Sequence, residues 1–393
     1  MTLNLQAIMH YDKQMKSKHL FIGLMSGTSA DGIDAALVSF EDEKHYKIIE
    51  KSDTPFDKKL QQSIIAFNES GDNELDRMGA LDVKLGNAFA DSVKALLKKA
   101  GLKNTDISAI GSHGQTIRHS PNSTDSFTLQ IGDPNIIASK TGIKTVADFR
   151  RKDLALGGQG APLAPAFHQA IFRNTQQNRI ILNIGGIANI TYLPKDQTQK
   201  VVGFDTGPGN VLLDYWIYKQ KNHKFDRGGE WAASGSVDIT LLTRLLAEPY
   251  LALHPPKSTG RELFNSDWLE HQLLGFTHLS AEDVQATLTE FTCQSITDAI
   301  TMCDAQLKLN DTASEIYICG GGAKNNHIMK RLQALLPNRK VSTTKELGIA
   351  PDLVESVAFA WLAHRTINKL SGNLTSVTGA REQRVLGAVY CGN

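Results

Sequence analysis

Two pairs of short apolar runs each predict a β-hairpin. In the first pair, Leu20–Met25 and Ile33–Phe40 flank a stretch of small polar residues. In the second, Ile180–Ile184 and Ile187–Leu193 flank Gly185-Gly186, which we expect to supply the positive φ angles of a tight turn. Because alternating strand and helix signals follow each pair, we expect an architectural duplication, although no residue-level repeat is visible.

The remaining hydrophobic pattern predicts an α/β fold. Leu81–Ala100 places apolar residues close to every 3.6 positions and ends before Gly101, as an amphipathic helix does. Further helices are expected at Asn135–Lys140, Val211–Tyr218, Ala286–Leu307 and Pro351–Leu370, and strands at Ile107–Ile110, Phe127–Ile131, Ile143–Val146, Val201–Phe204 and Glu315–Cys319. Such alternation indicates helices layered on mostly parallel strands. Tyr250–Gly260, with its prolines, is expected to form a loop.

Composition narrows the function classes. A length of 393 residues, with 41% hydrophobic and 21% charged residues, indicates a globular protein with two domains. The formal net charge of +1, with both signs interspersed, argues against nucleic acid as a partner. No apolar run approaches the roughly 18 residues that cross a membrane, so we expect no membrane partner.

The four cysteines, Cys293, Cys303, Cys319 and Cys391, form no CxxC pair. This spacing argues against a zinc site and against a disulfide framework, and it favours a reducing cytoplasm. Residues 1–19 contain charged residues and no uninterrupted apolar core, so they do not resemble a secretory signal. We expect them to form a frayed extension.

The turn of the first hairpin is a candidate phosphate site. It comprises Gly27, Thr28, Ser29, Ala30, Asp31, Gly32, Ile33 and Asp34. Backbone N–H groups and hydroxyls without bulk suit close approach to phosphate oxygens. Asp31 and Asp34 would repel a bare phosphate. We therefore expect Mg²⁺ to lie between these carboxylates and the phosphate, held by Asp31 through water. An ordinary hairpin with an Asp-Gly turn is the structural alternative.

Two other glycine clusters extend this interpretation. Gly185 and Gly186 could face the same polyphosphate, and Gly320, Gly321 and Gly322, directly after a strand, suit a flat ring such as adenine. There is no GxxxxGK[ST] motif, and no GxGxxG motif opens a helix after a first strand. A P-loop NTPase and a dinucleotide-binding Rossmann site are therefore not expected.

Asp205 is the candidate catalytic residue. It follows an apolar strand and precedes Gly207-Pro208-Gly209, a turn that would expose its carboxylate at the strand tip. A carboxylate in that position can act as a general base. The structural alternative is an N-cap for the helix Val211–Tyr218, but Asn210 stands nearer to that helix and suits the role better.

Several further polar residues are candidate substrate contacts. Arg150 and Arg151 precede the flexible Gly157–Gly160 stretch, and an Arg fork binds carboxylate or phosphate well; solvated surface charges are the alternative. His113, His119 and His168 match no metal spacing, so hydrogen bonds to substrate or backbone are expected. Glu355 lies early in a predicted helix, where it could either contact substrate or complement the helix dipole.

The ordered motifs resemble the anhydro-N-acetylmuramic acid kinases of bacterial peptidoglycan recycling. The resemblance runs from about Leu20 to the C-terminus. It rests on Gly23–Ser29 with Asp31-Gly32 and Asp34, Gly111–Thr116, Asp148–Arg151, Gly157–Pro162, Asn183–Gly186, Gly203–Asn210, Cys319–Ala323 and Ser376–Ala380.

The resemblance implies a fold and a domain organisation. The family groups with sugar kinases, actins and Hsp70 chaperones, in which two ribonuclease-H-like domains enclose ATP in a cleft between them. We therefore expect domain I at residues 20–144, joined by 373–393, and domain II at 145–372, after the extension 1–19. It also implies that Asp205 is catalytic, that the glycine turns bind the nucleotide, and that His113, Gln115, Arg151 and Glu355 line the sugar site.

The reaction implied is a coupled ring opening and phosphorylation. We expect Asp205 to deprotonate a water that attacks the anomeric carbon of the 1,6-anhydro sugar, while the released bridge oxygen takes the γ-phosphoryl group of ATP. The products are N-acetylmuramic acid 6-phosphate and ADP, with Mg²⁺ as cofactor. The alternatives are a sister kinase acting on a free sugar hydroxyl and an actin-like or Hsp70-like ATP switch. The oligomeric state is open, with a homodimer as one candidate.

Overall fold

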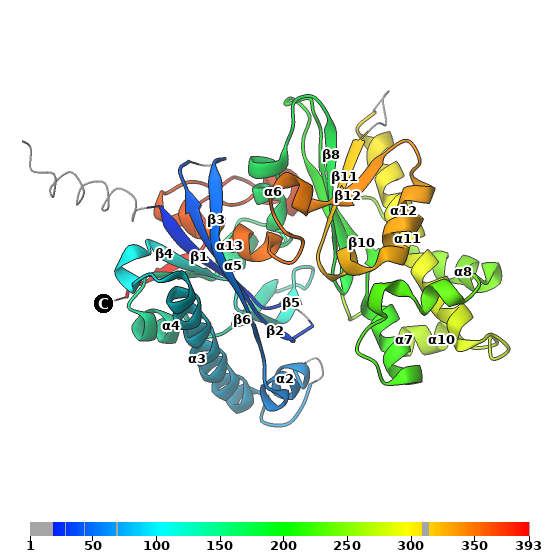
Figure 1. Ribbon diagram of the computed structural model, residues 1–393, viewed down its shortest axis with the longest axis horizontal. Helices are drawn as coiled ribbons and strands as arrows, with labels where there is room; N and C mark the ends of the chain where they lie inside the picture. The colour runs from blue at the N-terminus through cyan, green and yellow to red at the C-terminus, as the bar shows by residue number, and fades with distance from the viewer. Residues whose placement is uncertain (1–18, 28, 43, 68–69, 309–313, 393) are drawn as a thin grey trace, which may run out of the picture. The chain divides into compact units, whose positions relative to one another are not determined.

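The computed structural model describes residues 19–27, 29–42, 44–67, 70–308 and 314–392 (Figure 1). The expected extension 1–19, apart from His19, and Thr28 of the first turn lie outside these residues. The chain divides into two compact units, the first comprising Met1–Ile171 with Glu355–Asn393 and the second Phe172–Val354.

The first unit is built on a sheet of six strands in the order β13-β7-β4-β1-β2-β3. Its first three strands, β1 (Leu20–Met25), β2 (Gly32–Phe40) and β3 (Tyr46–Pro55), are successively antiparallel. β4 (Ala109–Ser112) then pairs parallel with β1, and β7 (Thr145–Ala147) parallel with β4. β13 (Ala388–Tyr390) closes the edge antiparallel to β7.

The second unit repeats this arrangement in the order β10-β9-β8-β11-β12. β8 (Asn178–Ile184), β9 (Ile187–Leu193) and β10 (Val202–Pro208) are successively antiparallel. β11 (Ser314–Cys319) pairs parallel with β8, and β12 (Lys340–Thr343) parallel with β11. The duplication expected from the two hairpins is confirmed, and this strand order is that of the ribonuclease-H-like fold.

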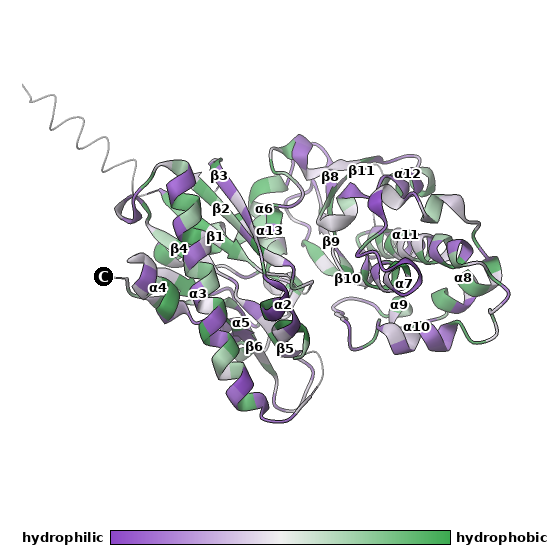
Figure 2. Cartoon of the chain, turned by 60° about the horizontal axis from the view of Figure 1, so that its bottom comes forward, coloured by the Kyte–Doolittle hydropathy of each residue, from purple (hydrophilic) through white to green (hydrophobic). Residues whose placement is uncertain are grey.

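Helices cover the first sheet on both faces. α3 (Glu74–Ala100) packs its Leu85 and Phe89 with Ile22 and Leu24 of β1 in one core, and Figure 2 shows hydrophobic and hydrophilic bands along this helix. Residues alternate across a strand, so the intervening Gly23 faces α13 (Val354–Ile367) on the other side. The unit also contains α2 (Lys58–Ile65), α4 (Pro134–Thr141), α5 (Phe149–Ala155), α6 (Ala164–Phe172), α14 (Thr375–Thr378) and the hairpin of β5 (Gln115–Ser120) and β6 (Phe127–Ile131).

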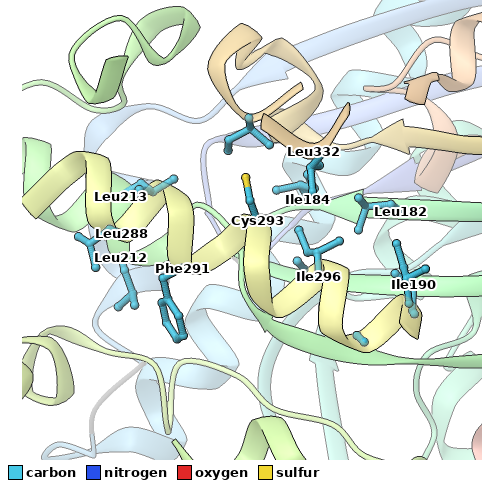
Figure 3. Close-up of a cluster of buried hydrophobic side chains, with 14 of the residues drawn as sticks. Leu182, Ile184, Ile190, Leu212, Leu213, Leu288, Phe291, Cys293, Ile296 and Leu332 are labelled. Atoms are coloured by element: carbon cyan, nitrogen blue, oxygen red, sulfur yellow. The ribbon is translucent and has the colours of Figure 1, made fainter. Parts of the chain in front are cut away.

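The second sheet is covered by α11 (Ala281–Gln306), whose Phe291 and Ile296 belong to one hydrophobic core with Leu182 and Ile190 of the sheet (Figure 3). Smaller helices complete the unit, namely α7 (Val211–Lys221), α8 (Ile239–Leu246), α9 (Pro249–Ala252), α10 (Ser266–Gln272) and α12 (Asn326–Leu335). Among the described residues, no helix combines the length and apolarity needed to span a membrane. The four cysteines are free thiols, and three of them are buried.

The structure places residues 145–171 and 355–372 in the first unit, whereas we expected them in domain II. Two contacts account for this placement. β7 completes the first sheet by pairing with β4. α13 lies so close to the sheet that a Cβ added at Gly23 would be 1.8 Å from the Ser356 carbonyl oxygen, and one at Gly111 would be 2.0 Å from that of Phe359.

Two local predictions differ from the structure. Gly185 and Gly186 do not adopt positive φ. Instead, their carbonyls accept hydrogen bonds from the start of α7, so the turn is fixed by a tertiary contact and not by left-handed glycines. β10 also continues to Pro208 beyond the expected end at Phe204, because a bulge between Asp205 and Gly207 lets it keep pairing with β9.

Candidate functional site

The turn between β1 and β2 is stabilised from within and by one residue of β5. Ala30 adopts a positive φ of 52°, and its N–H donates to the Gly27 carbonyl. Ser29 Oγ donates to Asp31 Oδ1 at 2.8 Å on the exposed side of the turn. The turn therefore presents the Ser29 hydroxyl and the Asp31 carboxylate at the surface, and its role as a phosphate site stays a prediction.

Gln115 fixes this turn. Its side chain is buried at 2% exposure. It accepts a hydrogen bond from Ser26 Oγ at 2.7 Å and donates from Nε2 to the Gly27 carbonyl at 3.2 Å. Gln115 was expected to contact the sugar, but these bonds commit its side-chain amide to the turn.

His113, Arg150 and Glu355 form an electrostatically coupled cluster within the first unit. His113 Nε2 accepts from Arg150 Nη2 at 2.9 Å, so Nδ1 carries the proton and donates to the Gly114 carbonyl at 2.8 Å. Burial, together with the Arg150 charge, lowers the pKa of His113 to about 3. The pKa of Glu355 is raised by burial, against the influence of Arg150. His113 is thus a neutral imidazole at physiological pH.

Arg151 lies differently from its neighbour. Its side chain is 64% exposed and donates from Nε to Asp148 Oδ1 at 2.9 Å. Arg150, by contrast, is part of the His113 cluster and also donates to the Gly160 carbonyl at 2.9 Å. The sequence-based choice of Arg151 as the sugar-contacting arginine stays a prediction, and the contact with His113 supports Arg150, the other arginine of the pair, as a second candidate.

Asp153 organises the glycine-rich stretch that follows. It is fully buried. Oδ2 accepts from the Gly160 N–H at 2.8 Å, and Oδ1 accepts from Asn373 Nδ2 and Thr378 Oγ1, both at 2.8 Å. One buried carboxylate therefore ties the Gly157–Gly160 stretch to the segment carrying the Ser376–Ala380 motif. Its neighbours supply the compensation that a buried charge requires.

The turn between β8 and β9 is held by the backbone. The N–H groups of Gly209 and Asn210 donate to the carbonyls of Gly186 and Gly185, each at 2.8 Å. Asn210 occupies the N-cap position of α7, as expected, but its side chain makes no capping bond and donates to the Ile184 carbonyl at 3.2 Å. The hairpin turn and the start of α7 therefore form one hydrogen-bonded unit.

Asp205 lies on the bulge of β10 and is half-buried. Bulges redirect side chains out of the regular strand alternation and are common beside active sites. Asp205 Oδ2 accepts from the Thr259 N–H at 3.0 Å, and its carbonyl accepts from the Tyr250 hydroxyl at 2.7 Å. The segment 250–259, which the sequence indicated only as a loop, thus contacts the candidate base at two atoms.

The glycines after β11 are not equivalent. Gly320 adopts a φ of 78°, and a Cβ there would be 2.3 Å from Asn183 Oδ1. A Cβ on Gly322 would be 2.4 Å from the Ile184 side chain, whereas the nearest atom to one on Gly321 lies 3.7 Å away. Gly320 and Gly322 are therefore required for packing, whereas a Cβ on Gly321 would make only an ordinary contact with the Asn210 side chain.

For magnesium, the residues offer one exposed carboxylate. Within the described parts of the chain, no group of three or more His, Cys, Asp or Glu side chains is arranged to hold a metal. Asp31 with its Ser29 partner fits an ion that keeps most of its waters and is shared with phosphate oxygens. Mg²⁺ at Asp31 stays a prediction.

Comparison with known proteins identifies close relatives. Residues 19–392 match the family model described as anhydro-N-acetylmuramic acid kinase. The chain is 52% identical to a protein of that name from Shewanella loihica, over 96% of this chain and 100% of the relative. It is 51% identical to one from Coxiella burnetii, over 95% and 98%. A ROK hexokinase structure from Thermus thermophilus covers 88% of this chain and 99% of its own at 14% identity, with a TM-score of 0.35 that supports no conclusion.

Proposed function

Since the chain belongs to the anhydro-N-acetylmuramic acid kinase family and is therefore a phosphotransferase, we propose that Asp205 is the general base of its reaction. The resemblance drawn from the motifs is confirmed by this membership, which also sets aside an ATP switch without a sugar substrate. The bulge position of Asp205 and its hydrogen bond from Thr259 carry the proposal. A base must be held in a fixed direction to accept a proton efficiently.

In the proposed reaction, Asp205 takes a proton from water as the water oxygen attacks the anomeric carbon. The bond from that carbon to the bridge oxygen breaks, and the bridge oxygen forms a new bond to the γ-phosphorus of ATP. ADP leaves with the electron pair of the broken phosphoanhydride bond. Each bond that breaks is matched by one that forms, and the proton resides on Asp205 until release.

The glycine turns are proposed as nucleotide contacts. Gly27 to Asp34, Gly185 and Gly186 would lie against the phosphates, and Gly320 to Gly322 would lie near the adenosine. Thr28 belongs to this proposal although it lies outside the described residues. Mg²⁺ held at Asp31 through water would neutralise phosphate charge when bound.

The sugar is proposed to contact His113, Arg150, Arg151 and Glu355. The neutral His113 can direct hydrogen bonds without adding charge, while the arginines suit the carboxylate of the muramic acid. Gln115 is proposed to act on the site indirectly, because its side chain fixes the turn that carries Gly27. We further propose a cytoplasmic location, which the four free thiols support. A homodimer stays a prediction that sedimentation would test.

The substitution Asp205→Asn tests the base. Asparagine keeps an oxygen that can accept from Thr259 but cannot take a proton, so turnover should fall by about a thousandfold while ATP still binds. Calorimetric titration with ATP and a coupled ADP assay measure the two properties. Asp298→Asn, at an exposed position on α11, is the control. Turnover near the wild-type rate in Asp205→Asn would contradict the proposal.

The water route has its own test. In H₂¹⁸O, the heavy oxygen should appear at the anomeric position of the product and be absent from its phosphate. Comparing the anhydro sugar with ordinary hexoses separates this reaction from phosphorylation of a free hydroxyl. Label in neither position, with efficient turnover of free hexoses, would favour direct deprotonation of a sugar hydroxyl.

A further inference from the structure

Lys257 is the most deeply buried charged residue of the segment that contacts Asp205. Its side chain is 6% exposed. Nζ donates to the carbonyls of Leu251 at 2.9 Å and Tyr250 at 3.3 Å. The same atom lies 4.8 Å from the centre of the Tyr250 ring and 5.5 Å from that of Phe204. The ammonium thus joins the 250–257 segment to the residue that precedes Asp205 in β10.

A buried ammonium is costly unless it has compensating partners. Two carbonyls and two ring faces supply part of the compensation, and the neighbouring Cys303 and Asp205 act to raise the pKa of Lys257. Burial acts in the opposite direction and dominates, so the pKa of Lys257 falls to about 8. A methionine of similar length would fill the same space without this cost.

The other titratable groups that face Lys257 do not replace Asp205 as its anion. Burial raises the pKa of the Cys303 thiol on α11 to about 12, so it is neutral at physiological pH. Burial, with the charges of Asp205 and Glu262, raises the pKa of Tyr250 above its usual range. Asp205 is therefore the anion on which the Lys257 charge acts.

We propose that Lys257 is a positioning residue for the catalytic base: its ammonium holds the 250–259 segment against β10 and keeps the Asp205 carboxylate anionic and correctly directed. The positive charge favours the ionised base. The backbone contacts of Lys257 keep Tyr250 and, two residues beyond the lysine, Thr259 in place to bind Asp205. This inference rests on Asp205 being the base.

Rate profiles from about pH 3.5 to 9.5, a range that includes the ordinary aspartate pKa of about 3.9, test the proposal. For the wild-type protein, we expect kcat to rise as Asp205 ionises and to fall again near pH 8 as Lys257 loses its proton. In Lys257→Met, kcat at pH 7 should fall by roughly tenfold or more, the acidic limb should move up by about one pH unit, and the basic limb should disappear.

Lys257→Arg separates charge from titration. Arginine keeps the charge but does not titrate below pH 12, so the acidic limb should stay in place while the basic limb disappears. Tyr250→Phe removes the hydroxyl bond to Asp205 without changing charge, and it should lower kcat without moving either limb. Lys340→Met is the matched control, because Lys340 also lies over a tyrosine ring, that of Tyr317, but is 53% exposed.

Several outcomes would overturn the inference. A uniform loss of activity at every pH in Lys257→Met and Lys257→Arg would assign Lys257 a purely structural role. A wild-type kcat that stays flat from pH 7 to 9.5 would do so even if Lys257→Met failed to fold. If Asp205→Asn keeps its turnover, the proposal that Asp205 is the base is contradicted as well. If Asp205→Asn is inactive while the acidic and basic limbs of the Lys257→Met rate profile match those of the wild type, only the role of Lys257 is contradicted.

Discussion

The two hairpin turns occupy equivalent places in two sheets of the same order, yet they are held by different means. In the first unit, the Gly27 carbonyl accepts from the Gln115 side chain in addition to the Ala30 N–H of the same turn. In the second, the carbonyls of Gly185 and Gly186 are bound by backbone N–H groups at the start of α7. A single side-chain substitution can therefore loosen the first turn, whereas the second is sensitive mainly to steric crowding.

The helices that cover the two sheets also pack against them by different means. α13 approaches the first sheet through Gly23 and Gly111, so closely that added Cβ atoms would overlap backbone atoms of the helix. α11 packs on the second sheet through a layer of larger side chains, including Ile296 and Leu182 (Figure 3). The close contact fixes the start of α13, where Glu355 joins Arg150 and His113. In the second unit, Asp205 is instead held by its hydrogen bonds with Tyr250 and Thr259.

Among the variants that test this comparison, Gly23→Val should have the largest effect on the free energy of unfolding. A Cβ at this position would be 1.8 Å from the Ser356 carbonyl oxygen and 2.5 Å from the Ala360 nitrogen, so the helix must move. We expect unfolding free energy to fall by about 3 kcal/mol, as measured by denaturant titration. Gly79→Ala on α3, where a Cβ meets nothing within 4 Å, should instead stabilise the protein slightly. Equal stability of the two variants would refute the close-contact account.

The next largest effect is a difference between the two units in how their stability changes as the pH falls. In the first, burial lowers the pKa of His113 and of His168 to about 3 each. The unfolded chain therefore binds more protons below about pH 6.5, and stability falls by about 1 kcal/mol per histidine between pH 7 and 5.5. In the second, the pKa of Asp214 is raised to about 7, mainly by burial, so its contribution is present at low pH and is lost as pH rises.

Hydrogen exchange measured by mass spectrometry checks this contrast. After correction for intrinsic rates, peptides of the first unit should lose protection from pH 7 to 5.5, and peptides around Asp214 should not. His168→Gln should reduce the pH dependence of the first unit, whatever its effect on stability at pH 7. An unchanged dependence in this variant would contradict the assigned histidine contribution.

A smaller effect is expected from Gln115→Leu. The substitution leaves the buried Ser26 hydroxyl without its acceptor and releases Gly27, so stability should fall by roughly 1 to 2 kcal/mol and the KM for ATP should rise. The paired variants in the second unit are Gly209→Ala, whose Cβ would lie 2.4 Å from the Gly185 oxygen, and Gly185→Ala, whose Cβ would make only an ordinary contact at 3.5 Å. Denaturant titration should show Gly209→Ala destabilised and Gly185→Ala close to wild type in stability.

The smallest effect on stability is expected from Arg151→Ala. Its pair with Asp148 is 64% exposed on the arginine side, and such pairs contribute less than about 1 kcal/mol. Arg150→Ala should be more disruptive, because it also releases His113 and Gly160. The KM for the sugar distinguishes the roles: a large increase in Arg151→Ala at unchanged stability would assign the substrate contact to Arg151, and an increase confined to Arg150→Ala would assign it to Arg150.

Local signals predicted much of the fold. Both hairpins form where the apolar runs placed them, and α3 ends at Ala100 with Gly101 in the left-handed conformation. These features depend on side-chain periodicity and on backbone preference, which a sequence shows directly. β3 was missed, although its residues alternate between exposed and half-buried positions, because its charged and polar residues mask the strand signal.

The sequence by itself determined the family, the α/β class, the duplicated hairpins and Asp205 as the candidate base, because ordered motifs and periodic apolar residues are local properties. Only the tertiary structure decided that Gln115 binds the turn at Gly27 and that Arg150 donates to His113. It also decided that Lys257 and Thr259 belong to the segment that contacts Asp205. These residues meet across tens of positions in the chain. Their roles depend on burial and on which partner satisfies each polar atom, and neither is encoded in residue spacing.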